Sequence, residues 1–261
     1  MINEKIDLYE NNDLYVNAAI DKIVVEIFNK RRADSGRAQT VLLMGASPLA
    51  GTTSTAIDLA IATAATGRRV LLIDCDVRKA EKYKKLNEQA AQGLADFLLQ
   101  DMSGEGSLKA DEILYDTNVD HLQYIPCGTC PANPTRALCS TGLKPLMLYL
   151  QGKYDYIICD LPSINVVPDA QILFPLADGI ILLAALGETR KRSIREARKK
   201  IEPYGDRYYG MIINKINPDI YRKAVKDYDY YLPDGKGNQR LGGSPAAKEY
   251  KKRQKAEERA R

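Results

Sequence analysis

The sequence alternates short apolar runs with helix-like segments, and this alternation constrains the fold more than any other feature. Six runs rich in Val, Ile and Leu cover residues 40–47, 68–76, 121–128, 154–162, 178–186 and 208–216. Segments with a helical period of apolar residues separate several of them, at residues 53–66, 135–150 and 189–204. Strands that are apolar throughout are typical of parallel sheets covered on both faces. The sequence therefore predicts an α/β fold with a mostly parallel sheet, helices on both faces and three layers.

Composition divides the chain into three regions. Residues 1–38 contain one amphipathic helical segment, from residue 14 to 32, followed by a basic linker. Residues 39–217 contain all six apolar runs and form the predicted α/β domain. Residues 218–261 have few aliphatic side chains, five tyrosines and a highly charged end, so we expect a mobile tail.

Several classes of protein are excluded by composition. The chain has 261 residues, 45% of them hydrophobic, and no apolar run approaches the roughly 18 residues that a membrane span needs. The acidic, polar N-terminus is not expected to be a secretory signal, and the five cysteines are an odd number, so we expect no disulfide framework. His121 is the only histidine, which argues against a histidine metal site or a Ser-His-Asp hydrolase. The net charge of +4 gives no reason to expect nucleic-acid binding.

The first apolar run leads into a loop that suits phosphate binding. Its sequence from Gly45 is GASPLAGTTST, and a helical segment follows. In a strand–loop–helix unit of this kind, backbone N–H groups surround the phosphates and the helix N-terminus favours negative charge. Gly51 would allow close approach of the backbone, and Thr53 could ligate Mg²⁺. The phosphate-loop motif requires a lysine at the position of Thr52, so a threonine-capped helix without a ligand remains an alternative.

Three aspartates end the next strands. Asp74 and Asp76 are two residues apart at the end of one run, so their side chains point to the same face, and Asp160 ends another run. In an open α/β sheet, ligands bind at the carboxyl ends of the strands. A single aspartate there is most often a turn residue, but three beside a phosphate-loop sequence favour a nucleotide site.

Residues 40–216 resemble the bacterial tyrosine kinases of capsule and exopolysaccharide synthesis, which are P-loop proteins related to partition and division-site ATPases. The matching segments are, in order, GASPLAGTTST, VLLIDCDVRKA, GLADFLL, YIPCGTCPANPTRAL, YDYIICDLPSINVVPDAQILFPLADGIILL and GMIINKI. The pattern G-x-x-x-x-N-P before a helix, which begins here at Gly128, and the pattern D-x-P-x-x-x-x-x-x-D-A set this family apart from other P-loop proteins. Here these are Asn133, Pro134, Asp160, Pro162, Asp169 and Ala170.

The resemblance implies ATP and Mg²⁺ as cofactors and assigns their sites residue by residue. The family's loop lysine falls on Thr52 and is absent, whereas its Mg²⁺-ligating hydroxyl falls on Thr53. Its Walker A′ aspartates fall on Asp74 and Asp76, and its Walker B aspartate falls on Asp160. The implied metal ligands are thus Thr53, Asp74 and Asp160, and the implied catalytic residues are Asp76, Asp74 and Asp160. The implied nucleotide contacts are Gly45, Ser47, Gly51, Thr52, Thr53, Ser54 and Asn214.

The resemblance also implies partners. The family's tyrosine-rich tail is phosphorylated between subunits, and its position is taken here by Tyr221, Tyr228, Tyr230 and Tyr231. The expected partner is a membrane-anchored polysaccharide chain-length or activator protein, which would place a cytoplasmic chain at the membrane. Self-association is expected as well. The N-terminal E-x-x-R-x-x-R segment that builds the family's rings is missing.

Three functions remain open on the sequence. The first is a regulatory or weakly active tyrosine kinase whose autophosphorylation is impaired by Thr52. The second is a non-catalytic pseudokinase that acts as a scaffold for its membrane partner. The third is a partition-type ATPase, which is the weakest because that class needs an early loop lysine and residues 46–49 contain none.

Overall fold

The computed structural model describes residues 5–9, 11, 13–30, 36–78, 92–103 and 108–217. Met1–Lys215 form one compact unit, and a second unit begins at Ile216. The tail tyrosines lie outside the described residues. The division of the chain at residues 38 and 217 stays a prediction. None of the described helices is long and apolar enough to cross a membrane.

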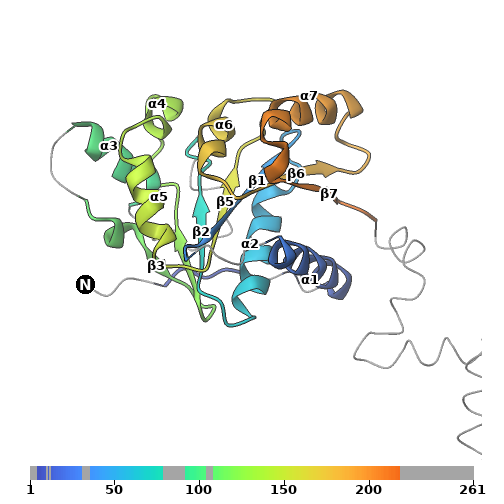
Figure 1. Ribbon diagram of the computed structural model, residues 1–261, viewed down its shortest axis with the longest axis horizontal. Helices are drawn as coiled ribbons and strands as arrows, with labels where there is room; N and C mark the ends of the chain where they lie inside the picture. The colour runs from blue at the N-terminus through green and yellow to red at the C-terminus, as the bar shows by residue number, and fades with distance from the viewer. Residues whose placement is uncertain are drawn as a thin grey trace, which may run out of the picture. The chain divides into compact units, whose positions relative to one another are not determined.

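A seven-stranded sheet forms the middle layer of the unit, in the order β3-β4-β2-β5-β1-β6-β7 (Figure 1). The pairs β4–β2, β2–β5, β5–β1, β1–β6 and β6–β7 are parallel, whereas β3 pairs antiparallel to β4. The α/β class with a mostly parallel sheet is therefore confirmed. The strands are β1 (Gln39–Gly45), β2 (Val70–Asp74), β3 (Tyr115–Asp116), β4 (Leu122–Ile125), β5 (Tyr156–Leu161), β6 (Gly179–Ala185) and β7 (Tyr208–Asn214).

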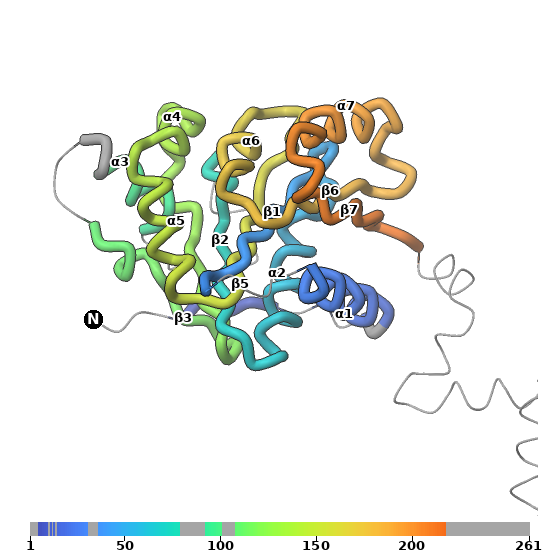
Figure 2. Tube along the Cα trace, viewed as in Figure 1, coloured from blue at the N-terminus to red at the C-terminus, as the bar shows by residue number. Residues whose placement is uncertain are grey.

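Helices cover both faces, and alternate side chains of each strand feed two separate cores (Figures 1 and 2). On β1, Val41 and Leu43 point into the core shared with α1 and α2, whereas Leu42 and Met44 point into the core shared with α3 to α7. The first pair of helices is α1 (Leu14–Asn29) and α2 (Thr52–Ala64). The opposite face carries α3 (Leu94–Ser103), α4 (Pro134–Leu138), α5 (Leu143–Gln151), α6 (Asp169–Leu173) and α7 (Lys191–Ile201). Short 3₁₀ turns complete the unit: η2 (Ala110–Ile113), η3 (Phe174–Leu176) and η4 (Glu202–Arg207).

The segment before α1 is part of this unit. Ile6 and Leu8 are 1% and 2% exposed, and Ile6 forms a parallel β-bridge with Thr117. The side chain of Asn118 accepts a hydrogen bond from the Leu8 N–H at 2.8 Å and donates one to the Leu8 carbonyl at 3.0 Å. The N-terminal segment thus extends the sheet beside β3 and adds to the α1–α2 core.

One sequence prediction of secondary structure is wrong. The periodicity predicts a single helix over residues 135–150, but α4 ends at Leu138 and α5 begins at Leu143. Between them the backbone hydrogen bonding changes from the i→i−4 spacing of an α-helix to i→i−3, because the Ser140 N–H donates to the carbonyl of Ala137 rather than to that of Arg136. Ser, Thr and Gly at positions 140–142 favour turns over helix interiors, which accounts for the break.

Candidate active site

The loop between β1 and α2 has the backbone shape that a phosphate needs. Gly51 precedes α2 in the left-handed region, at φ 87°, and offers the helix no side-chain cap. The threonine-capped helix considered from the sequence is therefore not what forms. A Cβ atom at Gly45 would lie 2.7 Å from the carbonyl oxygen of Ser47, so the loop closes tightly on its first glycine. The two glycines leave a concave loop at the N-terminus of a 13-residue helix.

We expect Gly51→Ala to destabilise the protein and to impair nucleotide binding. A Cβ atom would lie 2.2 Å from Nδ2 of Asn214, and alanine disfavours φ 87°. The combined strain should lower the free energy of unfolding by about 1–3 kcal/mol, measured by urea denaturation. Gly67→Ala is a matched control, because Gly67 also has positive φ, at 79°, but open space around its Cβ position. Equal losses in the two variants would show that the contact with Asn214 is unimportant.

Two of the three predicted aspartates stand opposite each other at the carboxyl edge of the sheet. Asp74 on β2 is in register with Asp160 on β5, and both are buried. Asp74 Oδ1 accepts a hydrogen bond from the backbone N–H of Asp76 at 2.9 Å, which holds that turn. Tyr124 donates to Asp74 Oδ2 at 3.5 Å, and burial together with this carboxylate raises the pKa of Tyr124 well above its usual value. These buried carboxylates are placed by the sheet itself and have little freedom to move.

Arg78 is fixed by a buried carboxylate. Its Nε and one Nη donate to the two oxygens of Asp169 at 2.6 and 3.0 Å, and Asp169 has no exposed surface. Thr135 completes the network, donating to Asp169 at 2.8 Å and accepting from Arg78 at 2.6 Å. The hydrogen bonds that Arg78 donates to Asp169 raise the pKa of the Arg78 guanidinium. This network ties the β2 loop to α4 and α6.

A cavity of about 720 Å³ opens beside the loop, a size that suits a nucleotide. Seven predicted site residues line it: Ser47, Gly51, Thr52, Thr53, Ser54, Asp74 and Asp76. Arg78, Ser163 and Lys215 line it too. Gly45, Asp160 and Asn214 do not contribute to its wall, so the structure gathers most but not all of the predicted residues around one cavity.

Three residues from distant parts of the chain hold the loop, and two of them, Thr189 and Asn165, carry no signal in the sequence. Thr189 shares a hydrogen bond with Ser47 at 2.8 Å, and Asn165 donates to the carbonyl of Ala46 at 2.9 Å. Asn214 Nδ2 donates to the carbonyl of Ala50 at 3.0 Å. The resemblance implied that Asn214 contacts the nucleotide, and the structure shows that Asn214 also contacts the loop itself. The contacts join positions up to 164 residues apart, so short-range patterns could not reveal them.

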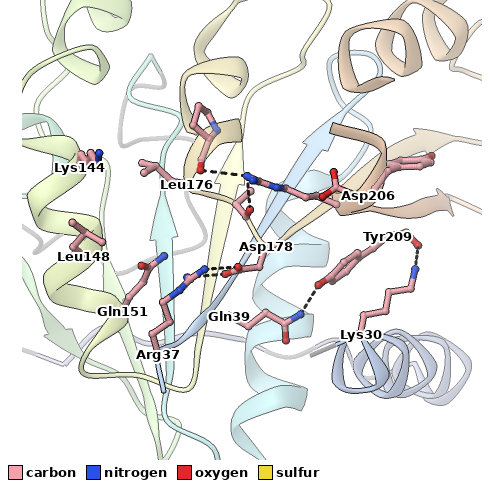
Figure 3. A pocket seen from close by; sticks show the side chains of 14 residues that line it. Lys30, Arg37, Gln39, Lys144, Leu148, Gln151, Leu176, Asp178, Asp206 and Tyr209 are labelled. Atoms are coloured by element: carbon pink, nitrogen blue, oxygen red, sulfur yellow. Dashed lines mark hydrogen bonds and ion pairs between the residues drawn. The ribbon is translucent and has the colours of Figure 1, made fainter. Parts of the chain in front are cut away.

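A second cavity, of about 840 Å³, lies at the opposite edge, where the strands begin (Figure 3). Arg37 pairs with Asp178 at 2.6 Å, Lys30 donates to the Tyr209 carbonyl at 2.9 Å, and Arg207 donates to three backbone carbonyls. Each of these three cations is therefore bonded to other groups of the protein. None of the predicted site residues lines this cavity, which leaves the loop cavity as the candidate active site.

The loop cavity fits a nucleotide with Mg²⁺. Ser163 Oγ is buried in its wall and has no hydrogen-bond partner among the residues that the structure describes, so it can bond a ligand or its water. The side chains of Thr53, Asp74 and Asp76 line the cavity and carry oxygen atoms, the ligand type that Mg²⁺ prefers. Within the described ranges, no three acidic, His or Cys side chains form a metal cluster. That is the normal situation for Mg²⁺, which relies on one or two carboxylates plus phosphates and water.

The chain matches known proteins along most of its length. Residues 50–252 match the model of the CobQ/CobB/MinD/ParA nucleotide binding domain. Tyrosine-protein kinase CpsD of Streptococcus pneumoniae is 28% identical over 235 residues, which is 89% of this chain and 96% of the relative. Tyrosine-protein kinase YwqD of Bacillus subtilis is 34% identical over 195 residues, covering 74% and 77% of the two chains.

A solved structure agrees with these matches. The VpsO kinase domain superposes with a TM-score of 0.63 at 26% identity, covering 77% of this chain and 96% of that domain. The fold, the loop beside β1 and these relatives lead to one assignment. The chain belongs to the CobQ/CobB/MinD/ParA family of P-loop nucleotide-binding domains and, within it, to the bacterial tyrosine kinases.

Proposed function

We propose that this chain is a weakly active, regulatory tyrosine kinase of capsular or exopolysaccharide synthesis. The observation that carries the proposal is the loop cavity, in which a glycine-bounded phosphate loop meets Asp74 and Asp76 while Thr52 stands where the family has its lysine. The tyrosine-kinase relatives favour a kinase over a partition-type ATPase. A membrane-anchored polysaccharide chain-length or activator protein is the proposed partner, and it would hold the chain at the membrane.

Each residue of the proposed site has a role that its chemistry supports. The N–H groups of the loop and the α2 N-terminus would bind the phosphates, with Mg²⁺ adding positive charge between them. Thr53 would ligate the metal directly, and Asp74 and Asp160 would hold its water ligands. Asp76 lines the cavity and is 5% exposed, so it is placed to accept the proton of a tyrosine hydroxyl. Phosphoryl transfer depends mainly on positioning and charge, so these few groups suffice.

The loss of the loop lysine accounts for the weak activity that we propose. Thr52 lines the cavity but brings no charge to the transferred phosphoryl group. Arg78 lines it as well, but its Nε and one Nη donate to Asp169 and Thr135, so its position is set by these partners and not by the loop. By analogy with removal of one oxyanion donor, the missing cation should slow the reaction roughly 10²–10³-fold.

The proposal is tested by incubating the full chain with Mg-ATP and mapping phosphotyrosine by mass spectrometry. We expect slow modification of Tyr221, Tyr228, Tyr230 or Tyr231, well below the roughly 1 s⁻¹ of ordinary kinases. Asp76→Asn should abolish it. Co-expression with an active bacterial tyrosine kinase tests whether the same tyrosines accept phosphate from another chain. Binding of Mg-ATP without any phosphotyrosine in either arm would contradict the kinase and favour a scaffold.

A further inference from the structure

The structure brings one unexpected cation into the wall of the loop cavity. β7 lies two strands away from β1 in the sheet (Figure 1). Lys215 directly follows β7, yet it lines the cavity together with Thr52 and Thr53. No sequence pattern pointed to this lysine, because it lies more than 160 positions after the phosphate loop. Two cations line the cavity among the residues that the structure describes. Arg78 is held at Nε and one Nη by the buried Asp169, whereas Lys215 pairs with the exposed Glu188.

A single asparagine places Lys215 beside the loop. Asn214 Oδ1 accepts from the backbone N–H of Lys215 at 2.8 Å, and its Nδ2 donates to the carbonyl of Ala50 at 3.0 Å. The side-chain amide of Asn214 also packs against Gly51, where a Cβ atom would lie 2.2 Å from its Nδ2. Lys215 itself takes a left-handed backbone conformation at φ 57°, which is uncommon for a residue other than glycine. The asparagine thus fixes the start of the lysine side chain next to the residues that precede Thr52.

The ammonium group of Lys215 has a weak internal partner. Its Nζ pairs with Glu188 Oε2 at 2.7 Å, and the two side chains are 39% and 58% exposed. Exposed ion pairs contribute little to stability, because water screens them and both side chains lose freedom. A nucleotide polyphosphate carries more negative charge than one carboxylate and offers several acceptors in a partly enclosed cavity. The ammonium group can therefore exchange Glu188 for a phosphate at small cost.

We propose that Lys215 contacts the phosphates of the bound nucleotide and partly replaces the missing loop lysine, with Glu188 competing for the same ammonium group. This inference rests on the proposed nucleotide site. It gives the loop a cation from the end of β7 instead of from α2. Because the lysine comes from another direction, it strengthens binding more than it assists phosphoryl transfer.

The test measures Mg-ADP and Mg-ATP affinity of the full chain by calorimetry. Lys215→Gln removes the charge and should weaken both affinities about tenfold, the effect of losing one charge-assisted hydrogen bond. Glu188→Gln should strengthen them by about two- to fivefold, because the competing carboxylate is gone. Lys199→Gln on α7 is the control, since it removes the same charge from an exposed position outside the cavity.

A second comparison separates this inference from the function on which it rests. In a Thr52→Lys background, Lys215→Gln should cost less than in the wild type, because the two cations would serve the same phosphates. If the wild type or Thr52→Lys binds Mg-ADP and Lys215→Gln binds it equally well, the role of Lys215 is refuted and the nucleotide site stands. If neither the wild type nor Thr52→Lys binds nucleotide, the proposed function fails and this inference fails with it.

Discussion

Replacing Thr52 with lysine is expected to raise the rate of autophosphorylation by roughly 10²–10³-fold, or about 3–4 kcal/mol of transition-state stabilisation. Thr52 is the first residue of α2 and lines the loop cavity, so the new ammonium group would start where the family has its own. The glycines, Thr53 and the carboxylates are already in place around it. The rate is measured as phosphotyrosine formed per chain with Mg-ATP in excess.

Thr52→Gln is the matched control, because it adds a long polar side chain without a charge. We expect it to leave the rate near that of the wild type. Equal activation by glutamine and lysine would mean that length, and not charge, limits the site. If Thr52→Lys binds Mg-ATP no better than the wild type and gains no activity, the loop no longer supports nucleotide chemistry and the weak-kinase proposal is wrong.

Replacing Asp169 with asparagine is expected to have the largest effect on stability. The substitution keeps the size of the side chain but removes the buried charge that accepts two hydrogen bonds from Arg78 and one from Thr135. Breaking a buried ion pair costs about 3–5 kcal/mol when the remaining charge stays buried. Arg78 is 34% exposed and can turn partly into water, so we expect the free energy of unfolding to fall by about 2–3 kcal/mol.

Urea denaturation of the full chain measures this loss. Glu196→Gln breaks the exposed pair between Arg192 and Glu196 on α7 and should leave the unfolding midpoint unchanged. The Asp169 variant should also release Arg78 from α4 and α6, so its nucleotide affinity should change together with its stability. An Asp169→Asn midpoint equal to that of the Glu196 variant would show that the network carries no stability.

Much of the fold follows from the sequence. Each of the six apolar runs coincides with a strand. For the inner strands the reason is that residues buried on both faces of a parallel sheet are apolar throughout, whereas the edge strand β7 is only partly buried. The sequence did not predict β3, because a strand of two residues is too short to show a periodic pattern. The break between α4 and α5 was missed because apolar spacing continues across it, while the local turn residues decide the backbone. The predicted tail tyrosines lie outside the described residues and stay a prediction.

The candidate site, like the fold, was only partly predictable from the sequence. The sequence by itself determined the phosphate loop, the missing lysine at Thr52 and the aspartates at the ends of β2 and β5, because these depend on residues close together in the chain. Only the tertiary structure decided which distant groups join them. Asp169 fixes Arg78 in the cavity wall, and Asn214 holds the backbone of Lys215 beside the loop. Such pairings depend on the order in which strands are arranged in the sheet, and that order is set by packing of the whole domain.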